Sequence, residues 1–349
     1  MKKLLLPIAF FYHIILSIRH KLYDWHLLKS KRFDLPVIGV GNLALGGTGK
    51  TPHVDYLIRL LSQHYRVGIV SRGYGRKTKG FLLADTRCNA NTIGDEPMQY
   101  LLKFNNVTIA VDEDRNRAIE RLNSLAYPPE VDLLDDAFQH RSTQAGLNIL
   151  LTTYDKPYCD DHLVPAGNLR DIKSAAQRAD IIIVTKAPEN LDDYKKAEII
   201  GKVNPGALQT VYFSSLVYET FKAVSPTAYQ TNPDLADTVL LFCGIARPKP
   251  LIDALKRRFK HVATLTFPDH HPYTYNDINR IIQRYRQLKG TEKIIVTTEK
   301  DVARLINSPY LCQFDAVPLF AAPVSIKIDK EEKFNKEILD YVRKNAHHG

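Results

Sequence analysis

A glycine-rich segment that ends in a lysine and a threonine carries the clearest chemistry in this sequence. Residues 39–52 read GVGNLALGGTGKTP, between an apolar run and an amphipathic helical pattern. In such a strand–loop–helix arrangement, backbone N–H groups cradle phosphates, Lys50 reaches the β- and γ-phosphates and the Thr51 hydroxyl ligates Mg²⁺. Ala44 stands where the first glycine of this pattern is usual. We predict a nucleoside triphosphate site rather than an ordinary glycine-rich turn. The residues expected to hold it are Gly46, Gly47, Thr48, Gly49, Lys50 and Thr51.

Two adjacent carboxylates, Asp135 and Asp136, follow an apolar run and end a predicted strand. A strand that delivers an acid beside a phosphate loop can hold Mg²⁺ directly or through water. A pair of acids at a strand end also caps turns, and the motif alone does not decide between these uses. Together with the upstream phosphate loop, it predicts a metal-binding role. Gln139 and His140 add polar groups at the same strand end.

Two further loops are expected at the same edge of the sheet. Ser71–Arg76 combines glycines with Arg72 and Tyr74, which suits contact with a phosphate or a sugar, although solvated loops have similar compositions. The segment Gly94–Pro97 places Asp95 and Glu96 at the start of a helix. Helix N-termini favour acids for capping and dipole reasons alone. This pair is of interest because the site otherwise lacks a base for an acceptor hydroxyl.

A histidine-rich loop, 269–272, lies in the second half of the chain. Paired histidines beside Asp269 are metal-ligand types, but no third and fourth ligand has recognisable spacing. A hydrogen bond from a histidine of this loop to a catalytic aspartate is a simpler use. The polar cluster Thr297–Asp301 follows another predicted strand, and its residues do not disclose a role.

Alternating strand and helix patterns must position these loops. Apolar runs alternate with helical periodicity up to about residue 203, which predicts a mostly parallel sheet covered on both faces, with ligands at the carboxyl ends of its strands. The expected strands are 36–40, 67–70, 107–111, 131–134, 147–151 and 181–184, and the expected helices lie near 96–103, 115–125 and 175–178.

A second α/β set is expected after a linker or antiparallel strand at 211–221. Its predicted strands are 239–243, 262–267 and 294–297, with helices at 250–259 and 276–288. The run 324–328 is expected to pair with the linker, followed by a charged helix at 330–345. The predicted fold is thus α/β: a P-loop NTPase-like lobe with a mostly parallel sheet, a second smaller α/β lobe, and an N-terminal amphipathic helix. The expected divisions are 1–30, 31–215 and 216–349.

The N-terminal segment resembles a basic amphipathic helix. A helix beginning near Pro7 places one set of side chains, mostly apolar, on one side and polar ones on the other. The apolar set is Ile8, Phe11, Tyr12, Ile15 and Leu22, and the polar set is His13, Ser17, His20 and Asp24. Such a helix lies in a membrane interface or packs on the protein's own core. The apolar run is too short for a comfortable membrane span.

A net charge of +10 favours an anionic partner. A membrane surface or a phosphorylated substrate fits better than nucleic acid, because no basic module with interleaved aromatic residues is present. The four cysteines have no C-x-x-C spacing. Nothing in the sequence indicates an obligate protein partner.

Taken together, the motifs resemble those of the tetraacyldisaccharide 4′-kinases, the lipid A 4′-kinases. They occur in the family's order and span nearly the whole chain. Two positions depart from the family pattern: Ala137 replaces a usual glycine, and Asp171 stands where Glu is common. The matching elements are 40–52, 71–74, 94–97, 135–140, 163–170, 268–271 and 298–301.

The resemblance implies transfer of the ATP γ-phosphate to the 4′-hydroxyl of a tetraacylated, 1-phosphorylated glucosamine disaccharide. It also implies a magnesium-dependent, peripheral enzyme on the cytoplasmic face of a bacterial inner membrane. The implied catalytic residues are Asp95 as the base, His270 and Lys50; the implied metal ligands are Thr51, Asp135, Asp136 and Asp171; and the implied substrate contacts are Arg72, Tyr74, Glu96, Gln139, His140 and Arg170.

A membrane-associated partitioning or positioning ATPase is the alternative, because its phosphate loop also contains Gly-Gly-Thr-Gly-Lys-Thr. That class carries a signature lysine just before the two glycines, where this chain has Leu45. A GTPase switch fits less well, since the 185–188 segment lacks an aspartate to read guanine.

Overall fold

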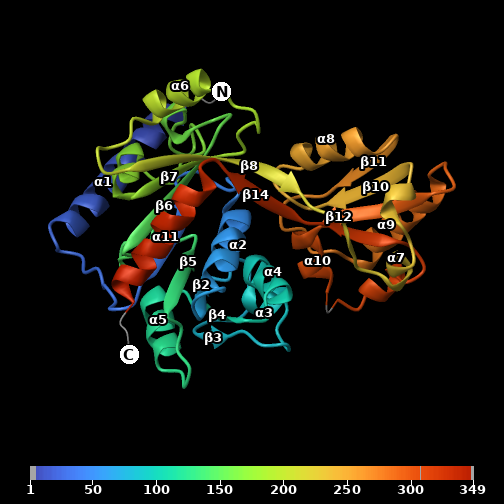
Figure 1. The fold of residues 1–349 in the computed structure, drawn as a ribbon, viewed down its shortest axis with the longest axis horizontal. Helices are drawn as coiled ribbons and strands as arrows, with labels where there is room; N and C mark the ends of the chain where they lie inside the picture. Colours follow the sequence, from blue (N-terminus) through green and yellow to red (C-terminus); the bar gives the residue numbers. More distant parts are fainter. Residues whose placement is uncertain (1–4, 307, 347–349) are drawn as a thin grey trace.

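A nine-stranded sheet forms the centre of the first lobe in the computed structural model, which describes residues 5–306 and 308–346 (Figure 1). The strand order is β14-β8-β7-β6-β1-β5-β2-β4-β3. Neighbouring strands are parallel except at the two edges, where β14 and β3 pair antiparallel. The strands are β1 Val37–Asn42, β2 Val67–Ser71, β3 Leu82–Leu83, β4 Val107–Val111, β5 Val131–Asp135, β6 Leu147–Thr153, β7 Ile181–Thr185, β8 Thr210–Tyr218 and β14 Val324–Ile328.

Helices cover both faces of this sheet, which explains why its central strands are continuous apolar runs rather than alternating ones. One face packs against α2, α4 and α11 in a single apolar cluster, and the other packs against α1, α5 and α6. The helices of this lobe are α1 Leu6–Asp24, α2 Lys50–Leu61, α3 Ala90–Ile93, α4 Asp95–Lys103, α5 Arg115–Asn123, α6 Asp193–Val203 and α11 Glu331–Asn345. Short 3₁₀ segments lie at Tyr158–Asp160 and Lys173–Arg178.

The second lobe has a five-stranded sheet in the order β11-β10-β12-β13-β9, with an apolar cluster on each face. Its α10 packs against α4 of the first lobe, and Figure 1 shows these two helices at the junction of the lobes. The elements are β9 Lys222–Ala223, α7 Pro226–Tyr229, β10 Thr238–Cys243, α8 Lys249–Arg258, β11 His261–Thr266, α9 Tyr275–Gln287, β12 Lys293–Thr298, α10 Glu299–Leu305 and β13 Leu319–Ala322, with 3₁₀ segments at Pro233–Leu235 and Leu311–Phe314.

The expected α/β class and mostly parallel first sheet are confirmed, but the expected boundary at 215/216 is wrong for the end of the chain. The run 324–328 does pair with the 210–218 strand, as predicted. That strand is not a linker, however, because it also pairs in parallel with β7 and so belongs to the first sheet. Consequently β14 and α11 return to the first lobe, where Phe334 and Ile338 join its main core.

Helix α1 packs on the first lobe while keeping a broad apolar surface exposed. Ala9 and Leu16 are buried in the cluster that it shares with β7 and α6. The sequence places His20 on the polar side of the helix, opposite Phe11 and Ile15. That side faces the protein at His20, which is 6% exposed because it pairs with the buried carboxylate of Asp171. Among residues 5–306 and 308–346, no helix is both long enough and apolar enough to cross a membrane. The exposed apolar residues of α1 are Leu6, Ile8, Phe10, Phe11, Ile14, Ile15 and Ile18.

Candidate active site

The phosphate loop connects β1 to α2 and is organised by the side chain of Asn42. Its amide nitrogen donates to Thr48 Oγ1 and to the Ala44 carbonyl, both at 2.9 Å. Its amide oxygen accepts from Lys50 Nζ at 3.3 Å. The Ala44 position forms an isolated bridge with Leu169 and has no left-handed backbone, so the missing glycine is tolerated. The loop residues with positive φ are Gly46, Gly47 and Gly49.

Thr185, the last residue of β7, and Lys186, which follows it, make hydrogen bonds to backbone carbonyls of the phosphate loop. Thr185 Oγ1 donates to the Thr48 carbonyl at 2.8 Å, and Lys186 Nζ donates to the Gly47 carbonyl at 2.6 Å. Burial, aided by the charge of Arg247, lowers the pKa of Lys186 to about 8. These two bonds satisfy the Gly47 and Thr48 carbonyls and so hold the backbone of the loop in place.

The two strand-end acids lie in different environments. Asp136 accepts a bidentate pair from Arg170 and lies 3.4 Å from Lys50 Nζ. Burial would raise its pKa, but the Arg170 hydrogen bond and the charge of Lys50 hold that pKa well below its usual range. Burial raises the pKa of Asp135 to about 7, and the nearby Glu96 charge adds to the rise. Asp136 adopts a left-handed backbone with φ 53°, a strained conformation for this residue that is typical of functional sites.

Buried oxygen atoms without partners lie beside these acids. Asp135 accepts a hydrogen bond from Tyr100 through Oδ2 at 3.2 Å, while its Oδ1 has no partner. Gln139 donates to the Asn42 carbonyl at 2.7 Å, and its own Oε1 is likewise unpaired. Oxygen ligands of this kind suit Mg²⁺, which is usually held by one or two carboxylates together with substrate phosphates. In the described part of the chain, no cluster of three or more His, Cys, Asp or Glu side chains forms a metal site by itself.

Asp171, implied to be a metal ligand, is used differently. Its Oδ1 accepts from His20 Nε2 at 2.6 Å, and its Oδ2 accepts from Arg178 at 3.3 Å. Both oxygens of this fully buried carboxylate are therefore engaged by cationic or ring N–H groups of the protein. Its neighbour Arg170 does join the phosphate site, because it donates to Asp136 and to Asn42 Oδ1 at 2.7 Å. The structure thus gives Arg170, and not Asp171, a place beside the acids.

Asp95 lies at the junction of the lobes, in the first turn of α4. Its Oδ2 accepts from His270 Nδ1 at 2.7 Å and from Arg304 Nε at 2.8 Å. The predicted hydrogen bond between His270 and Asp95 is therefore present. The N-cap of α4 is Gly94, without a side-chain capping bond, so the alternative use of Asp95 as a cap is wrong. Burial would raise the pKa of Asp95, but the His270 bond and the Arg304 charge lower it overall.

The surrounding contacts fix the orientation of His270. Lys300 Nζ lies 3.3 Å from His270 Nε2 and donates to Glu96 at 2.9 Å. With Nε2 facing an ammonium donor, the ring proton belongs on Nδ1, which then donates to Asp95. The Tyr74 ring meets the His270 ring edge-on at 5.4 Å. His270 itself has φ 58°, a second strained non-glycine residue at this site.

Two glycines bring the loop after β2 into contact with the start of α4. A Cβ on Gly94 would approach the Gly73 carbonyl carbon to 2.8 Å, and one on Gly73 would approach the Ile93 carbonyl to 2.6 Å. Both glycines have positive φ. The Arg72–Tyr74 loop is thereby packed against the residues just before Asp95, which brings together two motifs that are about twenty residues apart.

The remaining expected substrate contacts lie around a cationic cluster. Arg72 and Tyr74 are exposed, whereas His140 is partly buried. Burial and the charges of Arg115 and Arg72 lower the pKa of His140 to about 4, so its ring is neutral near neutral pH. Arg115 is 3% exposed and was missed from the sequence, because it lies in a helix with an ordinary amphipathic pattern.

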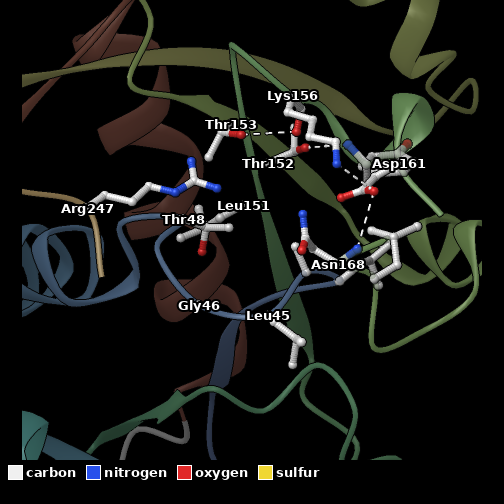
Figure 2. Close-up of a pocket in the computed structure, with 14 residues that line it drawn as sticks. Leu45, Gly46, Thr48, Leu151, Thr152, Thr153, Lys156, Asp161, Asn168 and Arg247 are labelled. Atoms are coloured by element: carbon white, nitrogen blue, oxygen red, sulfur yellow. Dashed lines mark hydrogen bonds and ion pairs between the residues drawn. The ribbon is translucent and has the colours of Figure 1, made fainter. Parts of the chain in front are cut away.

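Arg247 is a second residue that the sequence did not single out. It follows β10 in the second lobe and lines a pocket with Gly46 and Thr48 of the phosphate loop. Figure 2 shows its guanidinium group directed toward the loop, beside Thr48 and Thr153. A Cβ on Gly47 would lie 3.2 Å from Arg247 Nε. Both lobes therefore contribute to the surroundings of the phosphate loop.

The chain matches the model of the family described as Tetraacyldisaccharide-1-P 4'-kinase, LpxK, over residues 1–343. It is 44% identical over 360 residues to the tetraacyldisaccharide 4'-kinase of Bacteroides thetaiotaomicron, covering 99% of this chain and 94% of that protein. The corresponding protein of Flavobacterium johnsoniae is 44% identical over 345 residues, at 99% and 98% coverage. The crystal structure of LpxK from Aquifex aeolicus in complex with ATP is similar with a TM-score of 0.73 and 29% identity, covering 98% and 99% of the two chains.

Proposed function

This chain belongs to the tetraacyldisaccharide 4'-kinase family, and we propose that it transfers the γ-phosphoryl group of ATP to the 4′-hydroxyl of a tetraacyl glucosamine disaccharide 1-phosphate. The observation that carries this proposal is the double attachment of α4. Its first residue, Asp95, is held by His270 and Arg304 of the second lobe. Its Tyr100 hydrogen-bonds Asp135 of the nucleotide site. One helix therefore connects the carboxylate that we propose as the acceptor's base to an acid that we propose for the metal.

The protein's own groups divide the work of phosphoryl transfer. The loop N–H groups bind the phosphates, while Lys50 neutralises charge that develops on the transferring group. Arg170 holds Asp136 in place and keeps it ionised. Mg²⁺, carried with ATP, would neutralise the β- and γ-oxygens and would be held by Thr51, Asp135 and Asp136. Gln139, with an unpaired oxygen, is a further candidate ligand.

Asp95 then acts as the acceptor's base. An ionised carboxylate within hydrogen-bond reach of the hydroxyl accepts its proton as the phosphoryl group is transferred. The lowered pKa keeps Asp95 ionised, and His270 fixes the carboxylate's direction. Glu96, the next residue, and Tyr74, whose ring meets that of His270, lie near this position. Together with Arg72 and His140, whose charges lie close to each other, they would supply contacts for a phosphorylated sugar.

We also propose that α1 binds the cytoplasmic face of an inner membrane peripherally. Seven large apolar side chains of α1 are exposed, from Leu6 to Ile18. The net charge of +10 favours an anionic lipid surface. An acceptor with four acyl chains is itself membrane-bound, so an apolar helix on the enzyme brings the site to its substrate.

Purified protein, Mg-ATP and the tetraacyl disaccharide 1-phosphate should give a bisphosphorylated product, measured by thin-layer chromatography with γ-labelled ATP. Recovery of label only as inorganic phosphate, with stimulation by DNA, would instead support the partitioning ATPase. Family membership disfavours that alternative. A parallel incubation without acceptor measures the background hydrolysis.

A further inference from the structure

We propose that α1 is a positioning element of the phosphate site as well as a membrane anchor. The inference rests on the proposed kinase function and adds a role for the inner side of the helix. The chain segments that contain Gln139 and Arg170 are also the segments to which α1 makes hydrogen bonds. The coupling would make the geometry of the catalytic site depend on the docking of α1.

Three side chains on the inner side of α1 make this connection. Tyr12 donates from its hydroxyl to the Arg170 carbonyl at 3.3 Å. Arg19 donates to the Gln139 carbonyl at 3.1 Å. His20 pairs with Asp171 at 2.6 Å. Each contact falls on a residue that belongs to the active site or lies next to one.

Arg141, in the loop after β5 of the first lobe, also makes hydrogen bonds to α1. Its guanidinium donates to the His20 carbonyl at 3.0 Å and to Asp24 at 2.7 Å. Its charge also lies 5.0 Å from the centre of the Tyr23 ring. Because Arg141 follows Gln139 by two residues, the loop after β5 is attached to α1 at both positions.

The consequence follows from chain connectivity. Asp171 is fully buried, and its peptide neighbour Arg170 holds Asp136 and Asn42. If His20 is removed, Asp171 loses its 2.6 Å partner and keeps the Ile172 backbone N–H at 2.9 Å and the longer 3.3 Å contact with Arg178. Loss of one partner from a buried carboxylate is unfavourable, so we expect the segment around Asp171 to shift. Such a shift would move Arg170 relative to the phosphate loop.

The outer side of α1 offers separate variants for comparison. Phe11 is 66% exposed and Ile15 is 62% exposed, in contrast to the buried His20. His13 is also exposed and is polar. The two sides of one helix can therefore be changed independently, which allows membrane binding and turnover to be measured apart.

The test uses the full-length protein with two readouts. Sedimentation with anionic phospholipid vesicles measures membrane binding, and acceptor in detergent micelles gives kcat and the KM for ATP. His20→Ala should lower kcat at least tenfold while vesicle binding and the KM for ATP change less than threefold. His20→Gln, whose amide nitrogen can replace Nε2 as a donor, should recover much of the loss. Phe11→Ser should show the opposite pattern, with vesicle binding reduced at least tenfold.

Two further variants keep the inference testable if His20→Ala folds poorly. Tyr12→Phe removes one hydroxyl and should lower kcat two- to fivefold, whereas His13→Ala should leave both readouts unchanged. Wild-type kcat in both His20→Ala and Tyr12→Phe would overturn the proposal. So would a loss in His20→Ala that His20→Gln does not relieve and that follows the loss of vesicle binding. If the wild type transfers no phosphate to the disaccharide, the kinase proposal itself fails; the same variants are then compared by ATP turnover alone.

Discussion

The pairing of Asp95 with His270 predicts a specific non-additivity. Asp95→Asn keeps one acceptor oxygen, which can take the place of Oδ2 for both the His270 and the Arg304 donors, but removes the charge that accepts a proton. General-base catalysis contributes about 10²- to 10⁴-fold, so kcat should fall by that range while ATP affinity changes little. His270→Ala removes one hydrogen bond to a charged group, worth roughly 1.5–3 kcal/mol, which corresponds to about 10- to 100-fold in kcat. The double variant should be about as slow as Asp95→Asn alone, because His270 acts through the carboxylate.

The assay is initial-rate kinetics with saturating Mg-ATP and acceptor, supported by equilibrium ATP binding and thermal unfolding of each variant. Asp277→Asn is the matched control, because Asp277 forms a comparable pair with His271 at 3.0 Å within the second lobe. It should change kcat less than threefold. Near-wild-type turnover by Asp95→Asn would refute the base assignment. Strictly additive losses would show that the two residues act separately.

Three other measurements test the nucleotide site, the pairing of Asp95 and a buried carboxylate at the start of β5. Lys50→Ala and Asp136→Ala should each lower kcat by about a hundredfold or more; comparable kcat in both variants and wild type would exclude the nucleotide site. Arg304→Met removes a cation that lowers the pKa of Asp95, so the acidic limb of the pH–kcat profile should move to higher pH, and an unmoved limb would contradict the pairing. Burial raises the pKa of Asp132 to about 7, so between the ordinary pKa of aspartate and pH 7 the native state binds more protons than the unfolded state. The free energy of unfolding therefore falls as pH rises through that window. Asp132→Asn should therefore gain up to about 4 kcal/mol over wild type between pH 4 and pH 8, measured by urea unfolding; a constant difference across pH would refute the burial argument.

Local sequence patterns predicted most of the sheet and the phosphate loop, because these depend on continuous apolar runs and on glycine-rich turns. The return of β14 and α11 to the first lobe was only half anticipated: the strand pairing was expected, but not the lobe to which it belongs. Membership of a sheet is decided by long-range packing, which no window of the sequence contains. Helix α10 was seen only as a polar cluster, since its seven residues are too few to show clear periodicity.

Site residues within one motif could be predicted from the sequence, because the motif fixes their local geometry. Contacts between segments far apart in the chain could not. The strand-end position of Asp136 follows from its motif. The pairing of Asp171 with His20 joins positions 151 residues apart. The periodicity of α1 indicates which side of the helix His20 lies on, but not which residue it meets there. Arg247 and Arg115 were missed for a related reason: a single arginine in an ordinary pattern gives no local signal of where its side chain will lie.

The surroundings of Asp95, the proposed base, come from both lobes. Asp95 and Glu96 extend from α4 toward Lys300 and Arg304 of α10, while Glu299 of α10 receives Lys103 of α4 at 3.0 Å. Burial raises the pKa of Asp95, and the His270 hydrogen bond with the charges of Arg304 and Lys300 more than offsets that rise. These three partners all belong to the second lobe, so contact between the lobes supplies the groups that keep the proposed base oriented and its pKa low.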